Sequence, residues 1–139
     1  MSTPMRKKRS GQALVEIAIL LPVLLLLLML ILDLGRGIYY YSVIHNAARE
    51  GARYGIVHYG LTRDALIAGI IATAEERTTG LDLDDLTITP IVPAYPIQTG
   101  DLLEVTAAYR FEAVTPLVDL FIPGGYIDLD STSTMYFEK

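Results

Sequence analysis

One charge-free apolar run near the start of the chain constrains the fold more than any other feature. Residues 17–32 carry no charge and include a single helix breaker, Pro22. With its flanks the segment covers residues 12–34, which is 23 residues. As a helix it spans roughly 35 Å at about 1.5 Å per residue, enough to cross a hydrocarbon core about 30 Å thick. Because a backbone in lipid must satisfy its own amides, the sequence predicts a transmembrane helix over residues 12–34.

Positive charge lies on one side of this run only. Four consecutive cations occupy residues 6–9, and no acidic residue occurs among the first eleven. Basic residues flank the cytoplasmic end of membrane helices, so residues 1–11 are predicted to form a basic cytoplasmic leader and the C-terminal part to lie outside. A secretory signal peptide is the rival interpretation, but the residues after Leu32 offer no small-x-small cleavage site.

Composition limits the classes of function. Residues 58–139 suffice for one modest core but not for the layered scaffold of most enzymes, so we expect no enzymatic activity and no cofactor. All sixteen acidic residues and seven of the eleven basic ones follow residue 11. This acidic balance argues against nucleic-acid binding. The chain has no cysteine, which excludes disulfides and cysteine chemistry.

The helical pattern continues past the end of the apolar run. Apolar and small residues recur at helical spacing at Leu34, Ile38, Tyr41, Ile44, Ala48, Ala52 and Ile56. We therefore expect a single helix from about residue 12 to residue 57, with residues 35–57 outside the membrane. Asp33 and Arg36 are interpreted as markers of the exit into water, a surface pair worth only about 0.2–0.5 kcal/mol.

A stripe of small residues lies on the outer part of this helix. Ala47, Gly51 and Gly55 share one face, and Gly51 and Gly55 form a small-xxx-small pattern. Such a stripe permits close approach of another element. The favoured neighbour is this chain's own second helix or sheet, and the alternative is a partner protein.

Residues 58–139 are predicted to form a small extracytoplasmic α+β domain. A second helix is expected over residues 62–79, with Thr62 as its N-cap. The pattern then changes to period two, with a strand from residue 86 that Pro90 confines to a sheet edge. Residues 103–111 alternate as a long central strand, and about residues 127–137 form the last one. The fold class is therefore α+β: a long N-terminal transmembrane helix that continues outside the membrane, a second short helix and a roughly three-stranded antiparallel sheet.

Residues able to carry chemistry are sparse. His45 and His58 have no ligand-like companions, which favours surface or packing roles. The acidic run at residues 82–85 lacks the glycine and the terminal glutamate of a standard calcium loop, so no metal site is predicted. Three tyrosines, residues 39–41, follow the apolar run, where aromatic side chains anchor at the membrane interface.

Several stretches resemble a known family. A basic leader that ends at Gly11, with a glutamate at Glu16, resembles the type IV prepilin processing signal. The runs at residues 11–16, 21–25, 33–36 and 46–54 resemble the TadE-like family, the pseudopilins of tight-adherence (Tad, Flp) pilus systems. The likeness is most specific over residues 10–55, and the Asn-Ala-Ala-Arg-Glu-Gly-Ala-Arg stretch from Asn46 is its most diagnostic part.

The resemblance implies a pilin-like fold and a processing event. A membrane prepilin peptidase would cut between Gly11 and Gln12 on the cytoplasmic face. Glu16 would then face the amino terminus of a neighbouring subunit and set the axial register of assembly. The residues alone leave a second interpretation equally open, in which Glu16 reaches the cytoplasmic interface without a partner.

The resemblance also implies a function, partners and a location. Arg49, Glu50 and Arg53 lie in the diagnostic stretch, which hints at contact with a partner subunit, although a solvated helix face is as good an interpretation. The chain would be a minor pilin that takes part in assembling an adhesion or secretion pilus. Its partners would be the membrane, a prepilin peptidase, other pilin or pseudopilin subunits and the assembly machinery. It would cross the bacterial cytoplasmic membrane once, with its N-terminus in the cytoplasm and its C-terminus outside. Three places stay open for the processed subunit: the filament, the pilus tip and the membrane.

An unprocessed single-pass membrane protein is the alternative function. Its outer domain would then be a module that binds a ligand or a partner. The bond after Gly11 and the carboxylate of Glu16 separate the two hypotheses, because only a pseudopilin requires them.

Overall fold

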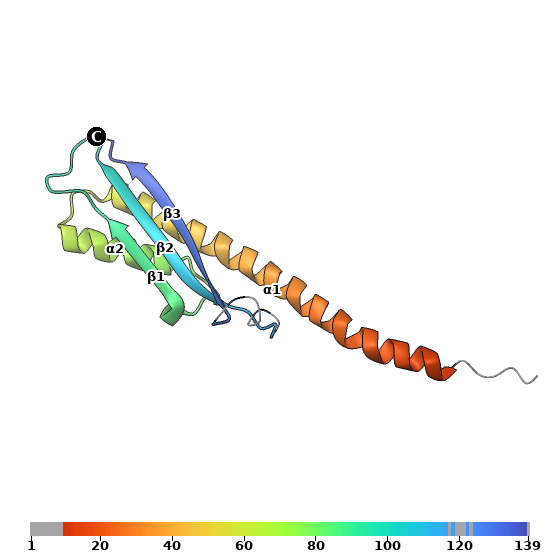
Figure 1. The fold of residues 1–139 in the computed structure, drawn as a ribbon. Helices are drawn as coiled ribbons and strands as arrows, with labels where there is room; N and C mark the ends of the chain where they lie inside the picture. The colour runs from red at the N-terminus through yellow and green to blue at the C-terminus, as the bar shows by residue number, and fades with distance from the viewer. Residues whose placement is uncertain (1–9, 117, 119–121, 123, 139) are drawn as a thin grey trace, which may run out of the picture.

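The fold is a long helix whose C-terminal half carries a second helix and a small sheet (Figure 1). The computed structural model describes residues 10–116, 118, 122 and 124–138. The elements in chain order are α1 (Ser10–Val57), α2 (Arg63–Glu75), a short 3-10 helix η1 (Leu83–Asp85), β1 (Leu86–Ile91), β2 (Leu102–Glu112) and β3 (Tyr126–Tyr136). The predicted α+β fold class is confirmed. The cations at residues 6–9 lie outside the described residues.

The sheet is antiparallel, with β2 between β1 and β3. Along β2 the side chains alternate between the two faces, and the buried ones are Leu103, Val105, Ala107, Tyr109 and Phe111. Pro90 lies in β1 opposite Val105, at the sheet edge where a residue without an amide is tolerated. The predicted order of one edge strand, one long central strand and a last strand is therefore correct.

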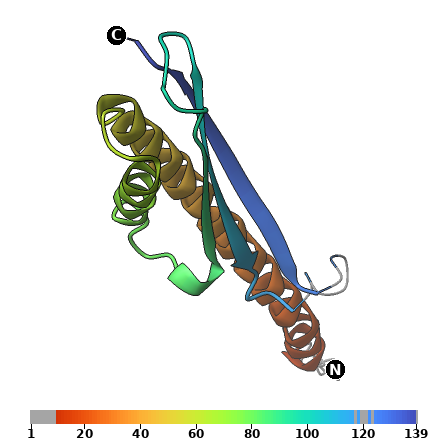
Figure 2. The ribbon, with the colours of Figure 1, turned by 90° about the vertical axis from the view of Figure 1, so that its left-hand side faces the viewer.

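Both helices pack on the same face of the sheet (Figure 2). One core cluster joins Ala52 of α1 and Ile70 of α2 to Leu103 and Val105 of β2. A second cluster joins Ile44 and Ala48 of α1 to buried residues nearer the end of β2. The helix contributes mostly small residues and the sheet and α2 contribute larger ones, which lets the elements approach closely. The core therefore lies entirely on the C-terminal half of α1.

The second helix is shorter than the sequence predicts. It ends at Glu75 rather than near residue 79, because the Thr78 hydroxyl donates to the Glu75 carbonyl at 2.7 Å and the backbone turns away. Gly80 then adopts a positive φ of 88°, which suits glycine. Thr62 occupies the predicted N-cap position with an extended backbone, and its side chain makes no capping hydrogen bond.

Candidate functional site

The expected processing site lies at the exposed start of α1. Helix α1 begins at Ser10, so Gly11 and Gln12 belong to its first turn, and both are exposed. A side chain added at Gly11 would meet nothing within 4 Å. Cleavage of the bond between Gly11 and Gln12 requires an extended backbone, so the helix has to unwind locally at these residues.

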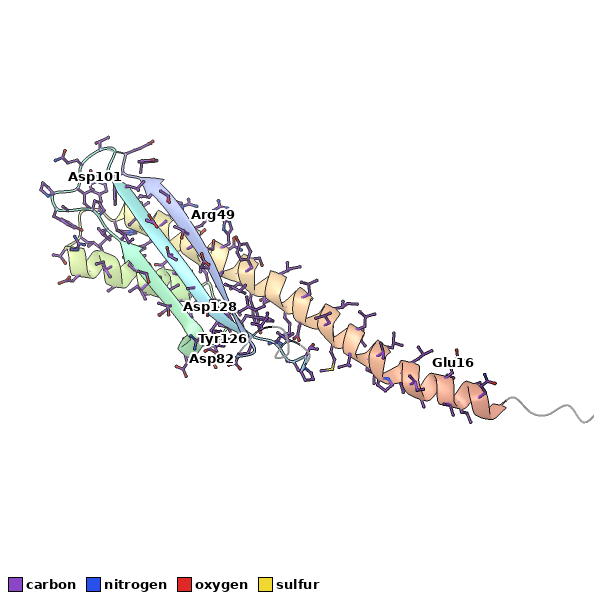
Figure 3. The ribbon with its side chains drawn as sticks, viewed as in Figure 1. Glu16, Arg49, Asp82, Asp101, Tyr126 and Asp128 are labelled. Atoms are coloured by element: carbon purple, nitrogen blue, oxygen red, sulfur yellow. The ribbon has the colours of Figure 1, made fainter. Side chains whose placement is uncertain are left out.

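Glu16 projects from the same end of α1, far from the sheet (Figure 3). Among the described residues the ion pairs are those of Asp33 with Arg36 and of Arg110 with Asp128, so Glu16 has no charged partner there. It is exposed beside a long apolar surface. The carboxylate is thus placed where a group from another molecule can reach it.

The N-terminal half of α1 is exposed, and we call it the bare half of α1. Most of its large apolar side chains between Leu14 and Leu34 are 46–68 % exposed. Within the described residues, α1 is the one helix long and apolar enough to cross a membrane. Such a surface is unfavourable in water, and the helix indicates a membrane-anchored protein.

Asp33 holds the segment just after β2 to α1, a contact that the sequence patterns did not predict. The predicted pair with Arg36 forms at 3.1 Å, but Asp33 is only 5 % exposed, so its interpretation as a surface marker is wrong. Its two carboxylate oxygens accept the backbone amides of Val114 at 3.1 Å and Thr115 at 2.7 Å. We call these four residues the Asp33 clamp. It fixes the chain just after β2 against the helix.

The charges of the Asp33 clamp lie against an aromatic wall. The guanidinium carbon of Arg36 is 5.3 Å from the ring centre of Phe111 and 5.6 Å from that of Tyr40. Tyr40 in turn meets Tyr109 edge-on, with ring centres 5.3 Å apart. Burial raises the pKa of the Tyr109 hydroxyl above its usual value, so that ring stays neutral at physiological pH. The cation is thus held by rings on one side and a carboxylate on the other.

The small-residue stripe faces this chain's own elements. A Cβ at Gly51 would come within 3.3 Å of Ala74 and Ile70 in α2, and one at Gly55 would overlap Leu103 and Ile70. Ala47 is fully buried as well. The stripe therefore serves the close approach of α1 to α2 and β2, the favoured of the two predicted roles.

The charged residues of the diagnostic stretch point away from the core. Arg49 and Arg53 are exposed and Glu50 is half-buried. Figure 3 places Arg49 on the outer surface of α1. In the part of the chain that the structure describes, none of the three forms an ion pair. Their predicted contact with a partner subunit stays a prediction.

The histidines and the acidic run have partners within this chain. The Nδ1 atom of His45 lies 3.0 Å from the Ser131 hydroxyl, and His58 stacks on Tyr54 with ring centres 4.0 Å apart. Asp82 accepts the amide of Asp84 at 3.1 Å and so caps η1. The described residues contain no group of three or more His, Asp or Glu placed to hold a metal ion.

Comparison with known proteins gives one family. Residues 11–53 match the TadE-like protein family, and this segment lies wholly within α1. No curated protein and no solved structure matches the chain significantly. The match includes Gly11, Glu16, the bare apolar surface, Asp33 and most of the small-residue stripe. The resemblance drawn from the sequence is therefore confirmed over residues 11–53, where the chain matches the TadE-like family.

Proposed function

We propose that the chain is a TadE-like pseudopilin, a minor pilin that takes part in assembling a tight-adherence type IV pilus for adhesion or secretion. It acts by assembly and not as an enzyme. The observation that carries the proposal is the family match over residues 11–53, the segment in which a bare apolar rod with a carboxylate near its start continues into a folded domain.

Processing would convert the anchor into an assembly-competent rod. A prepilin peptidase cuts between Gly11 and Gln12 and removes the four cations at residues 6–9. The new α-amino group has a reference pKa of about 7.7–8.0 and is largely protonated at neutral pH. The exposure of both residues supports this step, because no other described part of the chain covers the bond.

Assembly would then give the Glu16 carboxylate a partner of opposite charge. An ionised carboxylate in an apolar membrane segment is costly unless it has a partner, and Glu16 has no charged partner among the described residues. The new amino terminus of a neighbouring subunit supplies the opposite charge and sets the axial register. The bare apolar side chains of residues 14–32 pack against neighbouring helices as they leave lipid.

Co-expression with a prepilin peptidase tests the processing step. Intact mass and N-terminal sequencing should show the chain shortened by its first eleven residues, and Gly11→Ala should block the cut. Gly35→Ala is the matched control, because a side chain at Gly35 also meets nothing within 4 Å. A wild-type chain that keeps its basic leader would contradict the proposal and favour the unprocessed single-pass membrane protein.

The role of Glu16 is tested separately from processing. Glu16→Ala should still be cut but should no longer co-purify with other pilin subunits, because the new amino terminus loses its counter-charge. Glu75→Ala, at an exposed glutamate in α2, is the control for loss of one negative charge. Co-purification of Glu16→Ala at the wild-type level would remove the assembly role.

A further inference from the structure

An apolar groove lies where α1 leaves the bare segment and meets the sheet. Its volume is about 360 Å³. The side chains that define it come from α1, the end of β2 and the start of β3: Leu30, Leu34, Ile38, Phe111, Ala113 and Ile127. The groove is continuous with the bare surface of α1, because Leu30 and Leu34 belong to both.

The rim of the groove is apolar and exposed. Leu34 and Ile38, which line it, are 66 % and 64 % exposed. Val114 is 64 % exposed and lies beside the groove, because it follows the lining residue Ala113 and its amide is bonded to the lining residue Asp33. Apolar side chains exposed in this way at and beside a groove indicate a surface that another apolar phase covers.

The length of the charge-free run indicates that the apolar phase covering the groove is lipid. Only 16 residues separate Glu16 from Asp33. As a helix they span about 24 Å, less than the roughly 30 Å of a hydrocarbon core. The membrane segment must therefore extend past at least one of these two carboxylates.

Because of the Asp33 clamp, the membrane segment extends more easily past Asp33, at its outer end, than past Glu16. Both oxygens of Asp33 are hydrogen-bonded and its charge is paired with Arg36, so this carboxylate needs no water. No Asp, Glu, Lys or Arg occurs between Arg36 and Arg49. Apolar surface thus continues to the tyrosines at residues 39–41, the residue type that gathers at membrane interfaces.

We propose that the apolar groove takes an acyl chain of an outer-leaflet phospholipid, so that the β2–β3 end of the sheet rests in the membrane surface. The inference rests on the membrane-anchored form in the proposed function, and it moves the outer membrane boundary from residue 34 to about Tyr41. Glu112, Arg110 and Asp128 are exposed on the other face of the sheet and keep that face at the level of the headgroups.

The chain has neither tryptophan nor cysteine, so single-tryptophan variants report one position each. Val114→Trp places the probe beside the groove, next to the lining residue Ala113. Leu24→Trp, in the bare half of α1, is the positive control. Ile91→Trp, exposed at the far end of the sheet, is the matched negative control. Each full-length variant is reconstituted into phosphatidylcholine vesicles, with and without bromine-labelled acyl chains.

Bromine should quench the fluorescence of Leu24→Trp and, to a comparable extent, that of Val114→Trp, and should leave Ile91→Trp unchanged. Ile38→Trp, at a residue that lines the groove, should repeat the Val114→Trp result and keeps the test valid if one variant is poorly folded. Quenching at both positions supports a lipid chain in the groove.

Three other outcomes overturn the inference. Quenching of Leu24→Trp alone leaves the anchor in place and removes the lipid contact of the groove. A disulfide-linked dimer of Val114→Cys, together with unquenched Val114→Trp, makes a second copy the occupant. Absence of quenching at Leu24 removes the membrane anchor itself, and with it the premise in the proposed function.

Discussion

The two halves of α1 have the same backbone and opposite surroundings. In the half before residue 43 most large apolar side chains are exposed, whereas Ile44, Ala48 and Ala52 in the other half are fully buried by α2 and the sheet. Both hydrophobicity and side-chain size distinguish the halves. Leucines predominate in the half that an external phase must cover, whereas the face that the chain covers itself includes Ala48, Gly51, Ala52 and Gly55. Small side chains on this face let the helix approach its own domain closely.

The junction between the two halves depends on one carboxylate, which gives the largest expected effect. Asp33→Ala leaves the part-buried amide of Val114 and the buried amide of Thr115 without their acceptor. The outer domain should lose about 2–4 kcal/mol of unfolding free energy, since hydrogen bonds to charged groups are worth about 1.5–3 kcal/mol each and are not fully additive. Denaturant unfolding of the full-length protein in detergent micelles measures the loss.

Two variants make this result specific. Asp33→Asn keeps one acceptor oxygen and should lose less stability than Asp33→Ala. Asp101→Ala removes a half-buried carboxylate whose solvent-exposed hydrogen bond accepts the Gln98 amide at 2.7 Å, at the far end of the sheet. If Asp33→Ala lowers the free energy of unfolding by no more than Asp101→Ala does, the Asp33 clamp does not hold the domain to the helix.

Glycine substitutions should have opposite signs in the two halves. Gly55→Ala would push a methyl group into Leu103 and Ile70. Overpacking costs about 1–3 kcal/mol, and the helix gains back about 0.5–1 kcal/mol from replacing glycine. A net loss of about 1–2 kcal/mol is expected. Gly35→Ala meets nothing within 4 Å and should gain about 0.5–1 kcal/mol.

Hydrogen exchange of the β2 amides in micelles distinguishes these two substitutions. Protection should fall in Gly55→Ala, because the methyl group separates α1 from β2. It should be unchanged or higher in Gly35→Ala, which lies outside the core. Equal effects of the two changes would mean that the small-residue stripe does not control the packing.

The sequence was sufficient for the elements and their order because those follow from local patterns. Alternation along β2, the proline in β1 and helical spacing to Val57 each involve neighbouring residues, and the structure agrees with all three. The end of α2 at Glu75 was missed because a Thr78 hydroxyl, not the glycine at residue 80, competes for its last carbonyls. Propensity does not show such competition.

Long-range polar contacts could not be predicted in the same way. Asp33 bonds to residues more than eighty positions away, and His45 meets Ser131 across a similar separation. No periodicity connects these residues. One signal was present for Asp33: a carboxylate beside an apolar helix face needs a partner, and an i,i+3 arginine alone leaves one of its oxygens unpaired. The roles of Gly11 and Glu16 depend on other molecules and stay predictions.

The ion pair of Arg110 with Asp128 gives the smallest expected effect on stability, and it contrasts most sharply with the Asp33 clamp. Arg110 and Asp128 lie 3.6 Å apart on the solvent-facing side of the sheet, with side chains 52 % and 67 % exposed. Arg110 also covers the ring of Tyr126, 4.5 Å from its centre, and Figure 3 shows Tyr126 and Asp128 near the start of β3. Exposed pairs of this kind contribute about 0.2–1 kcal/mol at most.

Asp128→Ala should therefore cost less than about 0.5 kcal/mol, and the loss should shrink further at high salt because exposed charges are screened. Arg110→Ala should cost slightly more, because it also removes the contact with Tyr126. Both are measured by the same micelle unfolding experiment as Asp33→Ala. The contrary result would be an equal loss of unfolding free energy in Asp128→Ala and Asp33→Ala. Charge pairs in this protein would then be stabilised by the closeness of opposite charges and not by burial together with backbone amides.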